Sequence, residues 1–399
     1  MIHSYLDGAS NTPLSPEVLQ AMLPYMSEDF VGNSMATHEF GTDANIAIER
    51  ARESIALDLH VRPDEIFFTS GATEGNNWVI KSAAFRALLL NKSPRKTIIC
   101  SKTEHASVFN CCKQVEDWGM NVVFVEPDRR GSVQFDAIQP YLSGPSSVAD
   151  DIALICLMAV NNEIGVDNGV GEITRAAAML GIPVLVDCTQ ALSCGGINVE
   201  IGDLYPDATF MTFSAHKIYG PLGCGCLVAR DSDVLEPLII GGAQEKGLRG
   251  GTMNTPGIIG MASAVHIAHA VDCTPQFMSL FKYLTREAQT KVPEMSVNCW
   301  PDHMNIVSLN FARVLPPNID QLASMLASRG IAVSAGSACD ATHNETEGDF
   351  NGSHVLTALG LTERDIRCTI RVSFTKYTTT SDIDELLQAI KEICEWSQM

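Results

Sequence analysis

Short apolar runs that alternate with longer helical patterns restrict the fold of this chain more than any other feature. Runs of strand length occur at Glu65–Thr69, Thr97–Ser101, Val122–Val125, Ile152–Val160, Val184–Asp187, Thr209–Phe213 and Gly225–Ala229. Apolar residues at helical spacing accompany them, as at Ile48, Ala51, Ile55 and Leu59. Strands separated by helices are typical of a parallel sheet covered by helices. We therefore predict an α/β fold with a mostly parallel central sheet.

The last third of the chain has a different pattern, with fewer and longer elements. A helix is predicted over 274–291 and a strand over Asn305–Phe311, and Ser381 with Asp384 three residues later predicts the start of a final amphipathic helix. These elements indicate a smaller α+β domain over 265–399 beside a large domain over 1–264. The first ~15 residues are expected to pack with the small domain.

Charge and hydropathy exclude several classes of protein. The 27 basic and 47 acidic residues give a net charge of −20, which argues against direct nucleic-acid binding. The longest apolar stretch, Ile152–Val160, is too short to span a membrane, and the first ten residues lack the pattern of a secretory signal. We therefore expect a cytoplasmic protein whose 13 cysteines are reduced thiols.

A glycine-containing junction follows the first predicted strand, at Ser70-Gly71-Ala72-Thr73. If a helix follows, its unpaired backbone N–H groups and positive dipole end would suit a phosphate group. An ordinary turn fits the same residues equally well.

Two further strand ends carry candidate catalytic groups. Asp187 ends one strand, and Lys217 follows another directly before a Gly/Pro turn. Ligands of open α/β sheets bind at the carboxyl ends of strands. Lys217 is either a solvated surface lysine or the Schiff-base lysine of a pyridoxal phosphate site, in which Asp187 pairs with the pyridine nitrogen. A phosphate loop, an aspartate and a lysine in this order fit a single cofactor, and we therefore predict pyridoxal 5'-phosphate.

The motifs TSGATEGNN, TEHASV, VNNEIG, VDCTQ, SAHKIYGP, LRGGT and SAGSAC occur in this order. In this order they resemble the motifs of the cysteine desulfurases, which are fold type I (class V aminotransferase-like) pyridoxal phosphate enzymes. The resemblance extends from YLDGASNTPL to IRVSF and therefore covers nearly the whole chain.

The resemblance implies a role for individual residues. Lys217 would carry the cofactor, Asp187 would pair with the pyridine nitrogen and Gln190 with the phenolic oxygen. His105 would stack on the ring and assist proton transfer. The implied phosphate ligands are Ala72, Thr73, Ser214 and His216, with Thr252 supplied by the other subunit of a homodimer. The implied binding residues for the substrate carboxylate are Asn162 and Arg371, with Asn33 beside them, and no metal is implied.

Cys339 is the implied nucleophile. The small residues of 335–338 before it permit a close backbone approach, and the polar segment 340–352 after it is expected to form a mobile loop. The implied reaction converts L-cysteine to L-alanine, leaves a persulfide on Cys339 and passes the sulfur to an acceptor protein.

Some positions depart from the family pattern. Gly8-Ala9-Ser10 stands where the family usually has Asn-Ala-Ala, and the stretch between Cys339 and Ser353 is longer than in compact members. Alternative functions are a selenocysteine lyase, a transaminase on the same scaffold and a non-catalytic acidic binding protein. The sulfur could serve iron–sulfur assembly, RNA thiolation or DNA phosphorothioation, and for a nucleic-acid product we expect a separate basic carrier protein.

Overall fold

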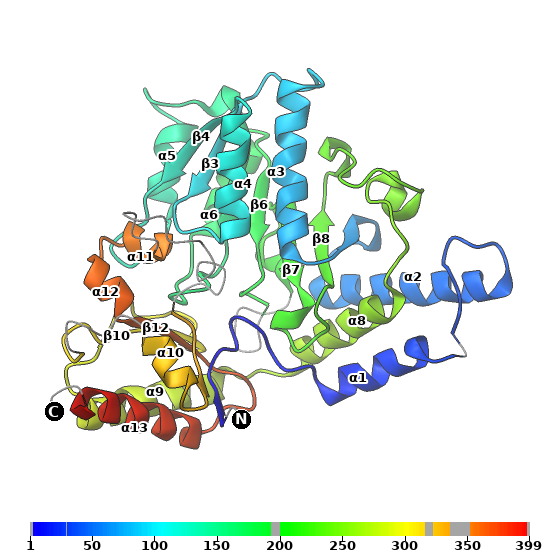
Figure 1. Ribbon diagram of the computed structural model, residues 1–399. Coiled ribbons are helices and arrows are strands. Elements are labelled where there is room, and N and C mark those ends of the chain that lie inside the picture. The colour runs from blue at the N-terminus through cyan, green and yellow to red at the C-terminus, as the bar shows by residue number, and fades with distance from the viewer. Residues whose placement is uncertain (1–2, 29, 193–199, 316–321, 336–351, 397–399) are drawn as a thin grey trace.

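A computed structural model of the chain describes residues 3–28, 30–192, 200–315, 322–335 and 352–396. In Figure 1 a large sheet with its helices forms the upper part of the molecule, and a smaller sheet with long helices lies below it. Within the described residues, no helix combines the length and the apolar character needed to cross a membrane.

The large sheet contains the strands that the sequence predicts. Their bounds are β2 Ile66–Thr69, β3 Thr97–Ser101, β4 Asn121–Val125, β5 Ile152–Met158, β6 Val184–Asp187, β7 Phe210–Ser214 and β8 Gly225–Ala229. The strand order is β2-β8-β7-β6-β5-β3-β4, and β8 runs antiparallel to both of its neighbours while the other pairs are parallel. The α/β fold class is therefore confirmed. The strand predicted to end at Val160 ends at Met158, because Val160 turns away to bridge Asp167.

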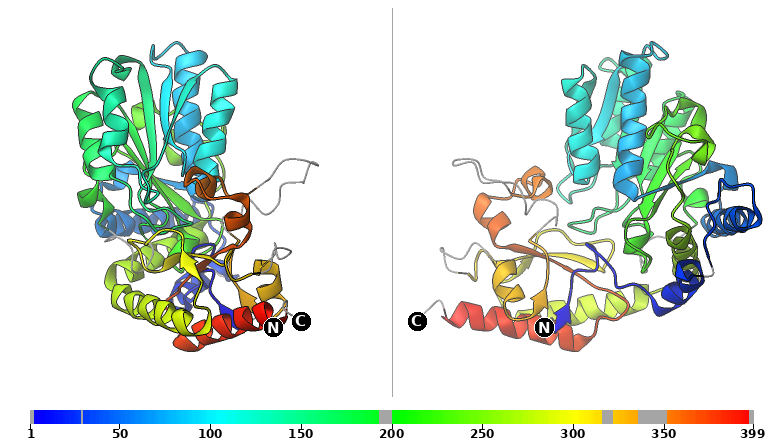
Figure 2. Two further views of the ribbon diagram at one scale, coloured as in Figure 1. Left: turned by 90° about the vertical axis from the view of Figure 1, so that its left-hand side faces the viewer. Right: turned by 45° about the vertical axis from the view of Figure 1, so that its right-hand side comes forward.

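Helices cover both faces of this sheet (Figure 2). On one face, α3 (Ala72–Leu88) and α4 (Ala106–Asp117) bury Trp78 and Val108 against strand residues such as Phe67. The other face packs against α2 (Glu39–Leu59), α6 (Val170–Met179) and α8 (Thr255–Ala270). Alternate strand residues thus enter different apolar clusters, as expected for a doubly covered sheet.

The smaller sheet has the antiparallel order β12-β10-β9, formed by Thr369–Ser373, Ile306–Asn310 and Ser296–Val297. Its helices are α9 (Thr274–Lys291), α10 (Leu322–Ala327), α11 (His354–Ala358), α12 (Glu363–Arg367) and α13 (Thr380–Trp396). The N-terminal strand β1 (Ser4–Tyr5) pairs with β11 (Ile331–Ala332), and Asp7 bridges Ser373. The remaining α-helices are α1 (Pro16–Met22), α5 (Phe135–Leu142) and α7 (Ile201–Leu204). The division at 264/265 stays a prediction, since that point lies within α8.

The start of the last helix differs from the prediction. The backbone N–H and the hydroxyl of Thr379 both donate to Oδ2 of Asp382, at 2.7 and 2.8 Å. The helix therefore begins with the pair Thr379 and Asp382, two residues before the predicted pair Ser381 and Asp384. Asp384 instead accepts bonds from Tyr283 and Lys291 of α9. The predicted apolar face is buried, at Ile383, Leu386, Leu387, Ile390 and Ile393.

Candidate active site

A cavity of about 210 Å³ lies at the carboxyl ends of β2, β5, β6 and β7. Predicted site residues that line it are Ala72, Thr73, His105, Asn162, Asp187, Gln190, Ser214, His216, Lys217 and Arg371. Asn33 and Thr252 are exposed and do not line it. Cys339 and the polar residues 340–351 lie outside the described residues.

One side of the cavity is formed by the N-terminus of α3. The Ala72 N–H donates to Oγ of Ser214 over 2.8 Å, which joins the start of the helix to the end of β7. Glycine is required at position 225, since a Cβ there would lie 2.4 Å from the Cα of Gly71. Burial, together with the charge of Lys217, lowers the pKa of His216 to about 4. A helix N-terminus with hydroxyl and imidazole donors beside it is suited to a phosphate group.

Lys217 lies at the end of the single 3-10 turn that follows β7. Its Nζ donates to the carbonyl oxygens of Ala9 and Ser10, at 2.5 and 2.6 Å. The amine is therefore held inside the cavity by the N-terminal segment. This placement excludes the interpretation of Lys217 as a solvated surface lysine.

Asp187 lies in the floor of the cavity and is only 6 % exposed. Its Oδ2 accepts a 2.8 Å bond from Nδ2 of Asn76, and its Oδ1 accepts a 2.9 Å bond from the Thr189 N–H. A carboxylate can accept further bonds from a ligand, because its two oxygens offer about four acceptor positions. The Thr189 hydroxyl, which also lines the cavity, is buried without a hydrogen-bond partner among the described residues.

His105 is the N-cap residue of α4. Its Nδ1 accepts a bond from the Ser107 N–H at 3.1 Å and lies 2.8 Å from the Ser107 hydroxyl. The preceding residue, Glu104, is fully buried, and its Oε1 accepts a 2.8 Å bond from the Met158 N–H. Burial raises the pKa of the Glu104 carboxyl well above its ordinary value.

The small sheet contributes Arg371 of β12 to the cavity lining, and this side chain is 2 % exposed. Its Nη2 forms a 3.0 Å ion pair with Asp7 and a 2.6 Å hydrogen bond to Oγ of Ser10, while Nη1 donates to the Asn162 carbonyl over 2.9 Å. Nε of Arg371 and Oδ1 of Asn162 are buried without a hydrogen-bond partner among the described residues. Such atoms are uncommon and point to a ligand that would satisfy them.

The segment that carries Cys339 is anchored at both of its ends beside this cavity. Before it, the backbones of Ser334 and Arg371 exchange hydrogen bonds of 3.2 and 2.7 Å. After it, the Ser353 hydroxyl donates to Glu163 over 2.5 Å, and Nε2 of His354 lies 2.8 Å from the Glu104 carbonyl. The described residues before Cys339 thus end next to Arg371, and those after it begin next to Glu104 and His105.

Comparisons with known proteins identify the family. The model of the aminotransferase class-V family matches residues 4–386. The chain belongs to this family.

Within the aminotransferase class-V family, the chain is similar to cysteine desulfurases. It is 35 % identical over 395 residues to the cysteine desulfurase IscS of Methanosarcina thermophila, covering 98 % of this chain and 92 % of that protein. A solved NifS-like protein is 30 % identical with a TM-score of 0.82, covering 99 % of this chain and all of the other. A structure of SspA in complex with cysteine is 32 % identical with a TM-score of 0.74, covering 94 % of this chain and all of that one. The predicted resemblance is confirmed.

This family implies pyridoxal phosphate, and the residues of the cavity fit that cofactor. The N-terminus of α3 suits its phosphate, Asp187 suits a protonated ring nitrogen, and Lys217 supplies an amine in the same cavity. Sequence reasoning missed Asn76 and Asp7, because their bonds to Asp187 and Arg371 join distant parts of the chain. It also missed Ser107 and Thr189, although each lies only two residues from its partner, His105 or Asp187. Ser10 was noticed only as a departure from the family pattern.

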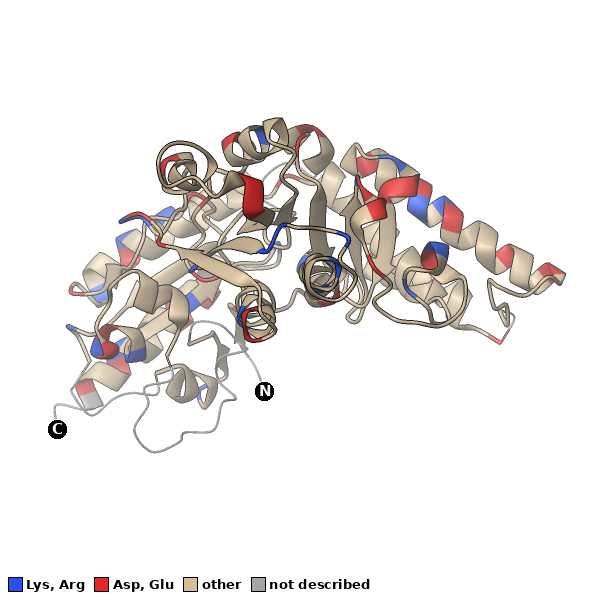
Figure 3. Ribbon diagram, turned by 90° about the horizontal axis from the view of Figure 1, so that it is seen from above, with Lys and Arg blue, Asp and Glu red and all other residues tan. Residues whose placement is uncertain are grey.

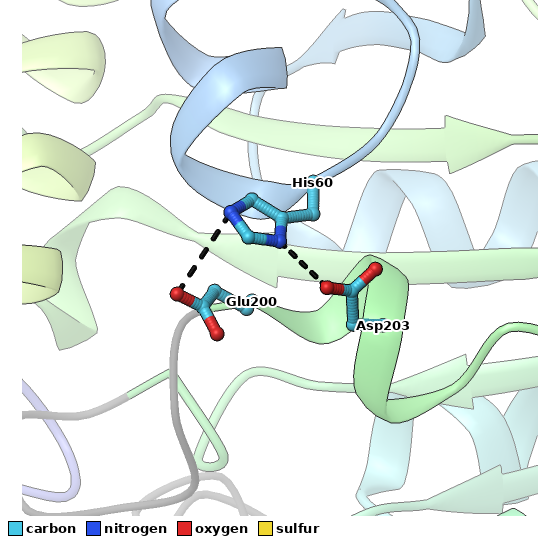
Figure 4. Close-up of side chains that lie close together, drawn as sticks. All are labelled: His60, Glu200 and Asp203. Atoms are coloured by element: carbon cyan, nitrogen blue, oxygen red, sulfur yellow. Dashed lines mark hydrogen bonds and ion pairs between the residues drawn. The ribbon is translucent and has the colours of Figure 1, made fainter.

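A second group of titratable side chains lies away from the cavity, where α2 ends (Figure 4). Nδ1 of His60 lies 2.7 Å from Asp203, and its Nε2 lies 3.8 Å from Glu200. The hydrogen bond to Asp203 raises the pKa of His60. Because the two carboxylates face different ring nitrogens, the arrangement is that of an ion-pair cluster that joins α2 to α7.

Proposed function

We propose that this chain is a pyridoxal phosphate-dependent cysteine desulfurase that converts L-cysteine to L-alanine and carries the sulfur as a persulfide on Cys339. The observation that carries the proposal is the cavity itself. It combines a lysine amine, a buried carboxylate and a helix N-terminus at one end with a buried arginine at the other. The two ends of the Cys339 segment are anchored next to these groups.

At the cofactor end, Lys217 would bind the cofactor, Asp187 would keep the ring nitrogen protonated and Gln190 would pair with the phenolic oxygen. His105 would stack on the ring and move the substrate proton, and the phosphate would be held by Ala72, Thr73, Ser214 and His216. When bound, pyridoxal phosphate withdraws electrons from the α-carbon of an amino acid, which makes its proton removable. The Thr189 hydroxyl adds an unpartnered donor at this end.

At the substrate end, Arg371 binds the carboxylate of cysteine, with the Asn162 side chain beside it. The unpartnered Nε of Arg371 and Oδ1 of Asn162 support this role, since a bound amino acid supplies both an acceptor and a donor. Asn33 remains a proposed contributor from outside the cavity.

The sulfur transfer uses the thiolate of Cys339. It attacks the sulfur of the bound cysteine, the bond between that sulfur and Cβ breaks, and the electron pair stays on Cβ, which takes up a proton. The products are L-alanine and a persulfide on Cys339, and no external oxidant or reductant is consumed. An acceptor protein then takes the outer sulfur.

The working form is proposed to be a homodimer in the cytoplasm, with Thr252 completing the phosphate site of the partner. Exposed apolar side chains gather on α1, on the turn after it and on α2, including Leu19, Leu23, Met26 and Ile46, which supports an interface there. Reduced thiols such as Cys100, Cys112 and Cys156 suit a reducing compartment.

The acceptor is proposed to be a protein and not a nucleic acid. In Figure 3, basic residues are mixed with acidic ones along α2, and the net charge of the chain is −20. Tight, salt-sensitive binding of the purified chain to DNA or RNA would contradict this proposal.

The test measures alanine and protein-bound persulfide from cysteine with the purified holoenzyme. Cys339→Ser is expected to abolish both products, while Cys299→Ser, at a buried thiol that does not line the cavity, should keep them. Full activity of Cys339→Ser on cysteine would overturn the proposal. Activity confined to selenocysteine would indicate a selenocysteine lyase, and keto-acid-dependent amino transfer without sulfur release would indicate a transaminase.

A further inference from the structure

Asn76 of α3 joins the two catalytic groups at the cofactor end of the cavity. Its side chain is fully buried and does not line the cavity. Nδ2 donates to Oδ2 of Asp187 over 2.8 Å and to Oγ of Ser107 over 3.0 Å, and Oδ1 accepts a 2.6 Å bond from the Thr212 hydroxyl. The amide therefore connects β6, α4 and β7 through three short hydrogen bonds.

The chemistry of these partners fixes the orientation of the amide. An ionised carboxylate only accepts hydrogen bonds, so the nitrogen of Asn76 must face Asp187. With both amide protons in use, the Ser107 oxygen is the acceptor in its bond with Asn76. The Ser107 proton is then directed to the other neighbour of that oxygen, Nδ1 of His105, at 2.8 Å.

The backbone adds a second, longer contact to the same nitrogen. The Ser107 N–H can only donate, and it lies 3.1 Å from Nδ1 of His105. Nδ1 is thus an acceptor for two donors, so the proton of the neutral imidazole is on Nε2. Hydrogen-bond donation therefore runs outward from Asn76, on one side to Asp187 and on the other side through Ser107 to His105.

We propose that Asn76 is a positioning residue: it holds the Asp187 carboxylate toward the cofactor and, through Ser107, fixes the tautomer of His105 with the proton on Nε2. What Asp187 and His105 do in catalysis rests on the proposed function. The hydrogen-bond chain itself lies within the protein, so it can be measured without cofactor or substrate.

The first experiment is ¹⁵N NMR of histidine-labelled protein without cofactor, above the titration range of His105, with its signals assigned through His105→Gln. We expect the wild-type protein to show an unprotonated Nδ1 and a protonated Nε2. A protonated Nδ1 on neutral His105 overturns the proposal, whatever reaction the enzyme catalyses.

Two variants separate the two halves of the role. Asn76→Ala removes the donor to Asp187, so we expect about tenfold weaker equilibrium binding of pyridoxal phosphate together with a mixture of His105 tautomers. Ser107→Ala removes the hydroxyl contact of 2.8 Å and keeps the longer backbone contact of 3.1 Å to Nδ1, so we expect a partial shift toward the tautomer with the proton on Nδ1 and an unchanged cofactor affinity. The control is Ser82→Ala on the same helix, which is buried and bonded to the Glu236 N–H away from the cavity.

If Asn76 only stabilised the fold, the two variants would not differ in this way, with cofactor affinity lowered in one and unchanged in the other. Wild-type tautomer and wild-type cofactor affinity in folded Asn76→Ala overturn the proposal, as does a wild-type tautomer in Ser107→Ala. If Asn76→Ala does not fold, Asn76→Leu, which is close in volume and cannot donate to Asp187 or Ser107, takes its place in both measurements. An absent desulfurase activity with the expected tautomers would reject the proposed function and leave the positioning role intact.

Discussion

The two ends of the cavity differ in how their polar groups are satisfied. Around Asp187, the carboxylate, the Asn76 amide and the Ser107 hydroxyl are bonded to one another or to the backbone. Around Arg371, buried side-chain atoms of both Arg371 and Asn162 have no hydrogen-bond partner among the described residues. At the first end the charged carboxylate is held before any ligand arrives and only the Thr189 hydroxyl is left open, whereas the second end leaves open a nitrogen of the charged Arg371 and the amide oxygen of Asn162.

This difference has a physical reason. A cofactor that stays bound benefits from groups already held in place, because no reorganisation is needed when it binds. A buried polar atom without a partner costs free energy, and a substrate that satisfies it recovers that cost at each turnover. We therefore interpret the Asp187 end as the permanent site and the Arg371 end as the exchangeable one.

The largest expected effect comes from breaking the permanent end. Lys217→Ala should lose the visible absorption band of the bound cofactor and all alanine formation, because the cavity lining in the described part of the chain contains no other amine. Absorption spectra and product assays check this, with Lys102→Ala, a lysine paired with Glu126 at the surface, as the control. A Lys217→Ala protein with an unchanged absorption band and unchanged turnover contradicts the assignment.

A smaller effect is expected at the exchangeable end. Arg371→Lys keeps the charge but loses the planar, two-donor geometry, so KM for cysteine should rise about 10- to 100-fold while cofactor binding stays unchanged. Steady-state kinetics and a cofactor titration measure the two quantities. Arg286→Lys, at an exposed position of α9, serves as the control. Weakened cofactor binding with an unchanged KM would reverse the interpretation of the two ends.

Ser10→Ala tests how substrate binding at Arg371 depends on one neighbouring hydroxyl. Both protons of Nη2 of Arg371 are used, by Asp7 and by the Ser10 hydroxyl, so a carboxylate that binds Nη2 must displace that hydroxyl. Removing it should lower KM for cysteine by about tenfold, the lower end of the range for a hydrogen bond with one charged partner. An increased KM in Ser10→Ala would mean that the hydroxyl helps to hold the substrate; the exposed Ser27→Ala is the control.

The smallest expected effect is on the pH dependence of stability, through His216 beside the proposed phosphate site. The pKa of His216 is lowered from 6.5 to about 4 in the folded protein, so between these values the unfolded chain binds more protons. The contribution of His216 to stability is therefore complete above pH 6.5 and is lost as the pH falls toward 4. In cofactor-free protein, His216→Gln should lose less stability than wild type between pH 7 and pH 5.

Urea unfolding at the two pH values measures this difference. The exposed His269→Gln should behave as wild type, because its ring lies in solvent. If His216→Gln and wild type lose the same free energy of unfolding over this interval, His216 is not held neutral by the fold.

The sequence by itself determined the elements of the large sheet and the cavity residues that follow its strands. Strand periodicity and turn residues are local signals, and the carboxyl ends of parallel strands meet at one edge, so Asp187, Ser214 and Lys217 could be brought together from their positions alone. The start of α13 was misplaced by two residues, because two similar capping patterns overlap there and only the backbone shows which one forms.

Only the tertiary structure decided how the side chains are connected. Arg371 is held by Asp7 and Ser10, and Asp187 is joined to His105 through Asn76 and Ser107. These contacts join segments that lie far apart in the chain and depend on how the N-terminal segment crosses the small sheet and how α3 packs on the large one. Hydrogen bonds of this kind need positions accurate to a few tenths of an ångström, and no periodicity in the sequence encodes that accuracy.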